Sequence, residues 1–332
     1  MGASIEKPVY YIKVVSGKTT YNLRPAITAL ELSQPEKDIA QKLTFTCSNV
    51  KVDGKYLKNL IGLGQKVYIT YDSGSGKKEK FRGEIWATKS KDDVEKEVSF
   101  IAYDNLIYLQ ESKDSFYFAK GKSTKAVISS ICKKWGIKLS YNYKSITHPK
   151  LALHSKNLSD IIIDLLEDVR LKTGAKYCVR SIKGVLHINL VGKNSTIYHI
   201  RKKQNLMSTS VEKSKSGMIT KVVIRGPQDK KGKTSVKAVI KGKTSKYGTL
   251  QDEVSKSKDT SMKEVRKEAK EIISEKGKPF VTCKVEDAVD NPNINRGDKV
   301  HIVSGNMNGN YYVLSIEHDA VKRTMNLEVK SI

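Results

Sequence analysis

The stretch from Arg296 to Ile332 constrains this chain most, because it reads as a series of adjoining strands. Two runs rich in β-branched and aromatic residues flank a cluster of glycine and asparagine, Gly305 to Asn310. Asparagine and glycine tolerate the positive φ of tight hairpin turns, so Asn308-Gly309 is predicted to lie in a hairpin loop. A third run, from Thr324 onwards, alternates apolar and polar residues, as a strand with one buried face does. The chain is therefore predicted to end in an antiparallel meander.

The same pattern occurs near the other end of the chain. Gly64 to Ile69 reads like Gly297 to Ile302, and Phe81 to Trp86 corresponds to Tyr311 to Ile316. Glu97 to Ala102 then matches the final strand. The two copies are too far apart for a stacked solenoid, whose repeats are roughly 20–50 residues long. The pattern predicts two related small β-barrels, although two unrelated antiparallel meanders would produce similar patterns.

The remaining segments predict a mainly β chain with an α/β insertion, an α+β fold. Helices are expected from Ser123 to Trp135 and from Asn157 to Gly174, each with a cap and an apolar stripe. A hairpin around Lys183-Gly184 follows, with Val179 opposite Ile188. The predicted domains are a first β-barrel over 1–112, an inserted α/β domain over 113–200, and a second β-barrel with a basic loop and one helix over 201–332.

Three finer predictions concern the third domain. A strand from Thr220 to Arg225 should end at Gly226-Pro227, because proline cannot donate to a β ladder. The polar, glycine-containing segment 241–258 is expected to be mobile. Ser261 and Glu264 form a capping-box pattern, which predicts the start of a helix.

Charge is distributed unevenly along the 332 residues, whose net charge is +26. Between Arg201 and Lys278 there are 22 Lys and Arg against 9 Asp and Glu, whereas Val281 to Ile332 has 6 against 7. A basic region can bind nucleic acid or an acidic protein surface. Lysine dominates here and aromatic residues are few, whereas base recognition favours arginine and stacking aromatics. We therefore favour a solvated basic face over a nucleic-acid interface.

Cysteine spacing and hydropathy exclude several other classes of protein. The 4 cysteines are widely separated and form no CxxC, which argues against a zinc site and a disulfide framework. Reduced thiols are expected. The first residues lack the apolar core of a signal peptide, and no run approaches the roughly 20 apolar residues that span a bilayer. We expect no membrane insertion and no cleaved secretory signal.

A search for catalytic chemistry finds little. None of the patterns GxGxxG, GxxxxGKS/T, HExxH and GxSxG occurs, and the 6 histidines do not cluster. The best pair is Cys178 and His187, predicted on the outer face of one hairpin with Arg180 opposite His187. An imidazole can hold a thiolate, but no oxyanion donor is identifiable, so a structural role is favoured. We expect no catalytic residues, no metal ligands and no cofactor.

Three further motifs have structural explanations. Glu167 and Asp168 are adjacent on a helix, so they point in different directions and cannot share a substrate. Arg296-Gly297-Asp298 matches an adhesion tripeptide, but it opens a strand, so Gly297 and Asp298 are predicted to shape a turn. The helix at 123–135 could be half of a peptidoglycan-binding module, yet burial explains its apolar stripe.

Taken in order along the chain, several phrases resemble the baseplate hub proteins of contractile phage tails and tail-like bacteriocins. The resemblance is to the hubs of PBSX-like defective prophages and to late control D proteins. It covers nearly the whole chain and is carried by Leu63 to Tyr71, Phe81 to Ile85, Ser99 to Leu109, Lys156 to Ile162, Gly174 to Tyr177, Gly297 to Ile302 and Tyr312 to His318.

The resemblance implies a structural, non-enzymatic hub: a homotrimer that adapts a sixfold tail tube to a threefold central spike. Two tube-like barrels per chain would give three chains six docking sites. Implied partners are the tube protein, the spike, other baseplate proteins and the tape-measure protein, in a tail assembled in the bacterial cytoplasm. The alternatives are a cell-wall-binding protein associated with peptidoglycan hydrolysis and a nucleic-acid-binding protein.

Overall fold

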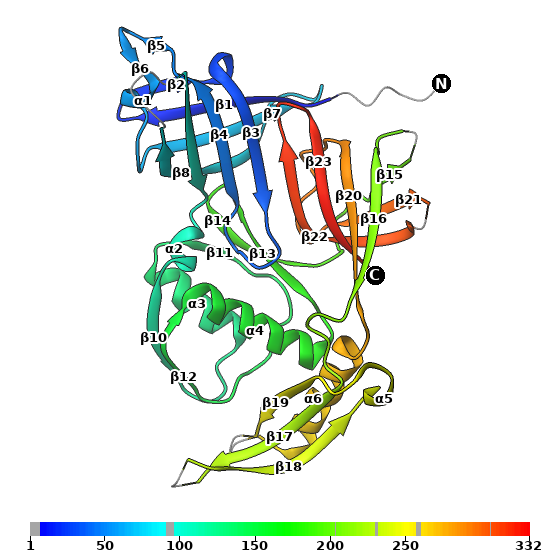
Figure 1. Ribbon diagram of the computed structural model, residues 1–332. Helices are drawn as coiled ribbons and strands as arrows, with labels where there is room; N and C mark the ends of the chain where they lie inside the picture. Colours follow the sequence, from blue (N-terminus) through cyan, green and yellow to red (C-terminus); the bar gives the residue numbers. More distant parts are fainter. Residues whose placement is uncertain (1–6, 91–95, 203, 230–231, 257–259, 306) are drawn as a thin grey trace.

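The computed structural model describes residues 7–90, 96–202, 204–229, 232–256, 260–305 and 307–332 (Figure 1). The protein is mainly β, with few helices. Its largest element is a 13-stranded sheet, almost entirely antiparallel, that crosses the upper part of the molecule in Figure 1. This sheet contains two β units, and two smaller α/β units lie beside it.

The N-terminal β unit is built around one apolar core. Its sheet strands are β1 (Val9–Ser16), β2 (Thr19–Asn22), β3 (Ile27–Gln34), β4 (Lys42–Ser48), β7 (Lys66–Asp72), β8 (Lys78–Lys89) and β9 (Glu97–Tyr103). Every second side chain of β4 is buried, namely Leu43, Phe45 and Cys47. The other long strands bury alternate residues in the same core, so the sheet must curve around it. A short turn of 3-10 helix (Arg24–Ala26), the hairpin β5 (Lys51–Val52) to β6 (Lys55–Tyr56) and α1 (Leu57–Leu60) decorate this unit.

The C-terminal β unit repeats this plan with different residues. It consists of β15 (Tyr198–Arg201), β16 (Ser208–Ser214), β20 (Phe280–Val289), β21 (Lys299–Ser304), β22 (Met307–Asp319) and β23 (Thr324–Ser331). Its strands follow the order β16-β20-β23-β22-β21-β15, and the first unit has β3-β4-β9-β8-β7-β1. The two orders correspond strand for strand, except that β15 runs parallel to β21 whereas β1 runs antiparallel to β7.

The middle unit is an α/β structure with its own core. It contains α2 (Ile107–Gln110), β10 (Lys113–Phe118), α3 (Thr124–Lys134), β11 (Lys138–Ser140), β12 (Leu151–Asn157), α4 (Leu158–Thr173), β13 (Tyr177–Ile182) and β14 (Val185–Leu190). The predicted pairing of Val179 with Ile188 is confirmed, and both residues are buried against α4. Ser123 caps α3 as expected, and Gly174, with φ of 75°, ends α4.

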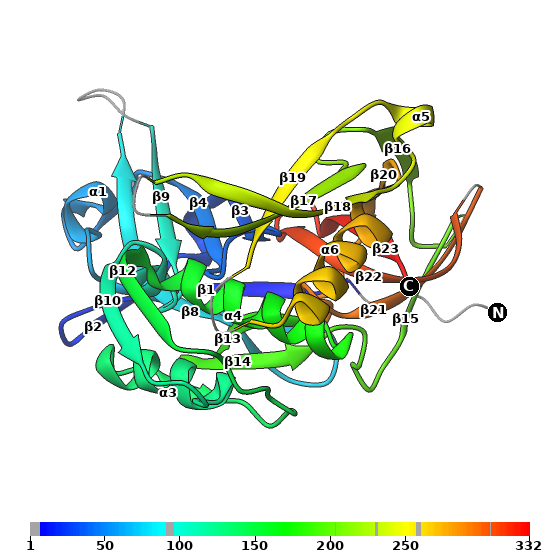
Figure 2. The ribbon, with the colours of Figure 1, turned by 90° about the horizontal axis from the view of Figure 1, so that it is seen from below.

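A lysine-rich unit follows, formed by β17 (Lys221–Gln228), β18 (Thr234–Lys241), α5 (Thr244–Tyr247), β19 (Gln251–Ser255) and α6 (Met262–Lys276). The helix α6 packs on the sheet β18-β17-β19 through a small core that includes Val222, Ile224, Val265 and Ala269. Figure 2 shows α6 beside α4 on the underside of the molecule. The predicted capping box of Ser261 and Glu264 is present.

Two local predictions were wrong. Asn308 and Gly309 lie inside β22, paired with Val303 and Ile302, because the connection from β21 is shorter than predicted. β17 continues through Gly226-Pro227, which sit at a ladder irregularity where a proline is tolerated. The segment after Lys241, which was expected to be mobile, contains α5 and β19, and β19 pairs in parallel with β17. Residues 257–258 of that segment, and Lys230 and Lys231 of the basic loop, lie outside the described residues.

Candidate functional site

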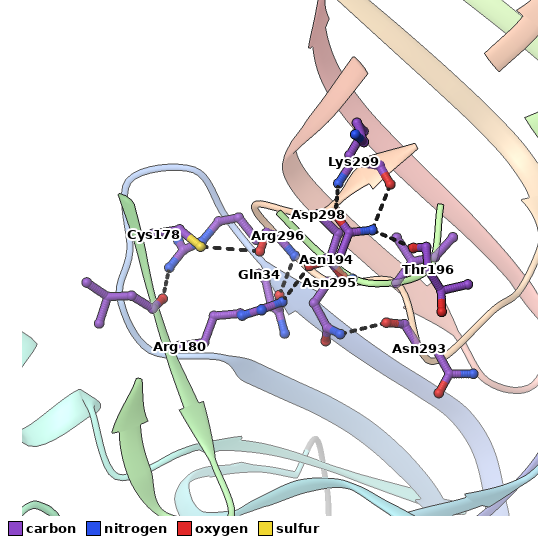
Figure 3. A network of polar contacts seen from close by, with 12 residues as sticks. Gln34, Cys178, Arg180, Asn194, Thr196, Asn293, Asn295, Arg296, Asp298 and Lys299 are labelled. Atoms are coloured by element: carbon purple, nitrogen blue, oxygen red, sulfur yellow. Dashed lines mark hydrogen bonds and ion pairs between the residues drawn. The ribbon is translucent and has the colours of Figure 1, made fainter. Parts of the chain in front are cut away.

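The loop from Asp290 to Asp298, between β20 and β21, is where the two β units and the middle unit meet (Figure 3). It carries the Arg-Gly-Asp motif at its end and is rich in asparagine. Side chains from β1, β3, β7, β8 and β13 reach it. We call this loop and the side chains that contact it the junction.

Arg296 is the central residue of the junction. Its guanidinium donates hydrogen bonds to the carbonyls of Pro35 and Asp38, in the β3–β4 connection, and to the carbonyl of Val179 at 2.5 Å. Its backbone N–H donates to Gln34 Oε1 at 2.9 Å. Arg296 is 8% exposed. Burying its charge would be costly, but the carbonyl oxygens accept hydrogen bonds from the guanidinium and offset that cost. One side chain thereby connects three units of the fold.

Gly297 and Asp298 contact the strand β13. Asp298 Oδ1 forms an ion pair with Arg180 Nη1 at 3.1 Å, and its Oδ2 accepts from Asn295 N at 2.9 Å. Gly297 has a φ of +87°, as the predicted turn requires, and a Cβ on it would lie 2.3 Å from Cys178 Sγ. Glycine is therefore needed here both for backbone conformation and for close packing.

Lys80 of β8 joins the junction from the N-terminal β unit. Its Nζ donates to Pro292 O at 2.6 Å, to Asn295 Oδ1 at 3.0 Å and to Ile294 O at 3.3 Å. Burial lowers the pKa of this ammonium to about 8, and the charge of Asp290 opposes the shift. Lys80 thus fixes the loop to β8 with hydrogen bonds shielded from water.

A second cluster of polar side chains lies at the start of the loop. Asp290 accepts from Tyr10 OH at 2.5 Å and contacts His318 Nδ1 at 2.6 Å. His318 and Asp290 are both fully buried, and burial lowers the pKa of His318. Burial likewise raises the pKa of Tyr10, which stays a donor. This contact joins β1 in the first unit to β22 in the second.

A cavity of about 360 Å³ opens beside the junction, lined by residues that include Tyr71, Lys80, Asp104, Arg180, Asn295 and Asp298. Of its charged groups, Arg180 and Asp298 form an ion pair, and Asp104 and Lys80 are hydrogen bonded to backbone atoms. Within the described part of the chain, no group of three or more His, Cys, Asp and Glu is placed to hold a metal ion. The arrangement is suited to holding three units rigidly together.

The surroundings of Cys178, which was considered with His187 for catalysis, are not those of a catalytic cysteine. Cys178 pairs across the hairpin with Asn189, and Arg180 pairs with His187, as predicted. Yet the Cys178 thiol faces Arg296 O at 3.6 Å, and burial raises its pKa. A nucleophilic cysteine needs the opposite shift. The Cys178 face of the hairpin, expected on the outside, is covered by the junction.

The adjacent carboxylates of α4 have separate partners, as expected from their positions on the helix. Glu167 pairs with Arg170, whereas Asp168 Oδ2 lies 3.5 Å from His148 Nδ1. No helix among the described residues has the length and apolar character to span a membrane.

Sequence reasoning missed Lys80, Asp290 and His318. For His318 there was a signal: Ile316, His318 and Ala320 alternate along the chain, and all three are buried. A histidine at an inward position of a strand needs a buried partner. Lys80 offered no such signal, because its partners, two backbone carbonyls and the side chain of Asn295, are more than two hundred residues away along the chain.

Solved structures with a similar fold include phage tail proteins and a component of a secretion system. A tail protein of Neisseria meningitidis superposes with a TM-score of 0.70 at 12% identity, covering 97% of both chains. The 43 kDa tail protein of prophage MuSo2 of Shewanella oneidensis gives 0.68 at 15% identity, covering 97% of this chain and 98% of that one. An Escherichia coli component of the type VI secretion system, described as similar to the T4 tail proteins gp27 and gp5, gives 0.55 at 8% identity, covering 96% and 75%. The fold is therefore that of phage tail proteins.

The sequence also matches a family profile described as YqbQ-like over residues 30–330, so the chain belongs to the YqbQ-like family. Protein YqbQ of Bacillus subtilis is 27% identical over 215 residues. That alignment covers 59% of this chain and 63% of YqbQ, less than two thirds of the relative's length.

Proposed function

We propose that this protein is the structural hub of a contractile-tail baseplate, a homotrimer that adapts a sixfold tube to a threefold spike. The observation that carries the proposal is the correspondence of strand order between the two β units. A threefold ring can meet a sixfold partner only if each subunit offers two similar surfaces. The tail-protein fold and the likeness to a secretion component described as similar to gp27 and gp5 support this role.

In this proposal each β unit acts as a small tube-like barrel, and the α/β insertion lies between them. The proposed division is 1–112, 113–200 and 201–332, supported by separate apolar cores in the two β units and the middle unit. The lysine-rich unit has a further small core of its own within the third domain. The junction then has a mechanical task, which is to keep two docking surfaces at a fixed angle.

The proposed partners are a second and third copy of the chain, the tail tube, the central spike, other baseplate proteins and the tape-measure protein. The proposed location is a tail or tail-like particle assembled in the bacterial cytoplasm. The proposed role is non-enzymatic, in agreement with a half-buried Cys178 whose thiol pKa is raised. The basic face of the lysine-rich unit would then contact acidic neighbours in the assembly.

The test is the mass of the purified chain and its position in the particle. Mass photometry should give three times the chain mass of 37.2 kDa. Electron microscopy of tails should place the trimer between tube and spike. A stable monomer that never enters tails would overturn the proposal.

A further inference from the structure

The large sheet has unpaired strand edges within the described chain, among them those of β16 and of the end of β8. In the described ladders β16 pairs only with β20, and the segment from Ala87 to Lys89 of β8 pairs only with β9. Thr88, Lys89, Glu212 and Lys213 are all exposed. Unpaired edges of this kind are templates for another strand.

The corresponding edges of the two β units are paired with each other inside the chain. The end of β22 pairs with β3, the strand that corresponds to β16: Ile316 faces Gln34, Glu317 faces Ser33 and His318 faces Leu32. Leu32, Ile316 and His318 are buried as a result. The contact is antiparallel and joins the two units into one sheet.

The two units can be aligned residue by residue. Gly64 N donates to Ile85 O at 2.8 Å, and Gly297 N donates to Val313 O at 2.8 Å. A ladder irregularity follows at once in both strands, between Ile85 and Ala87 in β8 and between Val313 and Ser315 in β22. Thr88 therefore corresponds to Ile316, and Lys89 corresponds to Glu317.

The residues of β3 and β16 are aligned through the strands that pair with them. Leu32 faces Leu43, which faces Ala102, and Ala102 faces Ile85. In the second unit the corresponding pairs are Val211 with Cys283, Cys283 with Val329, and Val329 with Val313. Leu32 therefore corresponds to Val211, Ser33 to Glu212 and Gln34 to Lys213.

We propose that β16 of one copy pairs antiparallel with the end of β8 of a second copy, in the register that joins β3 to β22 within the chain. Lys213 then faces Thr88 of the partner copy, and Glu212 faces Lys89. The pair Glu212 and Lys89 has opposite charges, which favours a cross-strand contact. This inference rests on the self-assembly in the proposed function and adds the surfaces and the register.

The two edges give the assembly its direction. Each copy has one free β8 end and one free β16 edge, on opposite sides of the molecule in Figure 1. A contact between unlike surfaces is head-to-tail and closes into a ring when its rotation divides the circle. Trp86 and Tyr108, packed edge to face and about 40% exposed, flank the β8 end and would be covered in this ring.

Cysteine cross-linking tests the register. The double variant Lys89→Cys/Glu212→Cys, oxidised under mild conditions, should give covalent dimers and trimers on a non-reducing gel. The shifted pair Lys89→Cys/Lys213→Cys places its side chains on opposite faces of the sheet. This shifted pair should give roughly tenfold less cross-linked product, because a disulfide forms only within a narrow range of distances and angles. The single variants are the controls for the native cysteines, of which Cys47, Cys132 and Cys283 are buried.

A charge exchange tests the same contact without oxidation. Glu212→Lys should weaken self-association, and Lys89→Glu in the same chain should restore it. A wild-type trimer with equal cross-linking of both pairs would overturn the register while leaving the hub intact. A monomer at every concentration would overturn the trimer as well as this contact.

Discussion

Gly64 and Gly297 occupy the same position in the two β units. Each has a positive φ, +77° and +87°, and each donates its N–H at 2.8 Å to a carbonyl of the second strand after it, Ile85 O of β8 or Val313 O of β22. Their surroundings differ. No atom lies within 4 Å of a Cβ built on Gly64, whereas a Cβ on Gly297 would lie 2.3 Å from Cys178 Sγ. The turn therefore has a packing role in the C-terminal unit and none at the corresponding glycine of the N-terminal unit.

Alanine substitution at these two glycines should separate backbone strain from packing. Gly64→Ala should lower the free energy of unfolding by about 1–2 kcal/mol, the cost of a left-handed alanine. Gly297→Ala should cost about 3 kcal/mol, because overpacking against Cys178 is added. Urea unfolding measures both. Cys178→Ala should recover part of the loss in Gly297→Ala and none in Gly64→Ala; equal losses for the two glycines would contradict the account.

Arg296→Lys should destabilise the protein by about 3 kcal/mol. A lysine lacks the planar fork, so buried carbonyls of the β3–β4 connection and of Val179 would lose their donors. Arg266→Lys, on the exposed face of α6, is the matched control and should change stability by less than about 0.5 kcal/mol. Chemical denaturation of both variants makes the comparison. Similar values for the two would show that the junction does not depend on the guanidinium.

Asp104 should make stability depend on pH between about 4 and 7. Burial raises its pKa to about 7, although the N–H groups of Gln41 and Leu106 oppose the shift. An unfolded aspartate has a pKa of about 3.9. The folded state therefore holds more protons in this window, and stability present below about pH 4 is lost as the pH rises through about 7.

The variant Asp104→Asn isolates this contribution. It carries a constant penalty, since its amide can accept only one of the two N–H groups. The difference in unfolding free energy between wild type and variant should shrink as the pH rises, by at most about 4 kcal/mol. Urea titrations at pH 4 to 8 measure it. Parallel curves would mean that the carboxyl is ionised throughout.

Lys241→Glu should stabilise the lysine-rich unit. Lys241 lies directly opposite Lys221 in the β17–β18 ladder, and like charges opposite one another are unfavourable by roughly 0.2–1 kcal/mol. Thermal unfolding at low salt should show the gain, and added salt should reduce it. Lys243→Glu, exposed and beyond the strand, makes the same change in net charge. An equal gain from Lys243→Glu would assign the effect to net charge alone.

Local pattern was enough to predict the meanders and the capped helices. The alternation of apolar and polar residues predicted the inward faces of β7, β9 and β23. The turn at Lys183-Gly184 predicted the pairing of β13 with β14. These features depend on neighbours in the chain. The repeat could be predicted for the same reason, because each copy is a local series of strands.

What could not be predicted depends on distant partners. β16 and β19 are short and polar, and they become strands only because β20 and β17 offer their edges. The sequence of the polar loop from Asp290 to Asp298 is typical of a surface connection. Its hydrogen-bond partners, however, lie on five strands from other parts of the chain. Arg296 and Gly297 were recognised as a motif, but only the fold brings them against Cys178 and Arg180.

The pairing of β3 with β22 also sets an order of events on the ribosome. β3 is made among the first strands and its partner among the last, at opposite ends of the chain. During most of translation the nascent N-terminal half therefore displays an open edge, which other chains could extend. Its protection arrives only after β22 has left the exit tunnel, and such late, distant pairing slows folding.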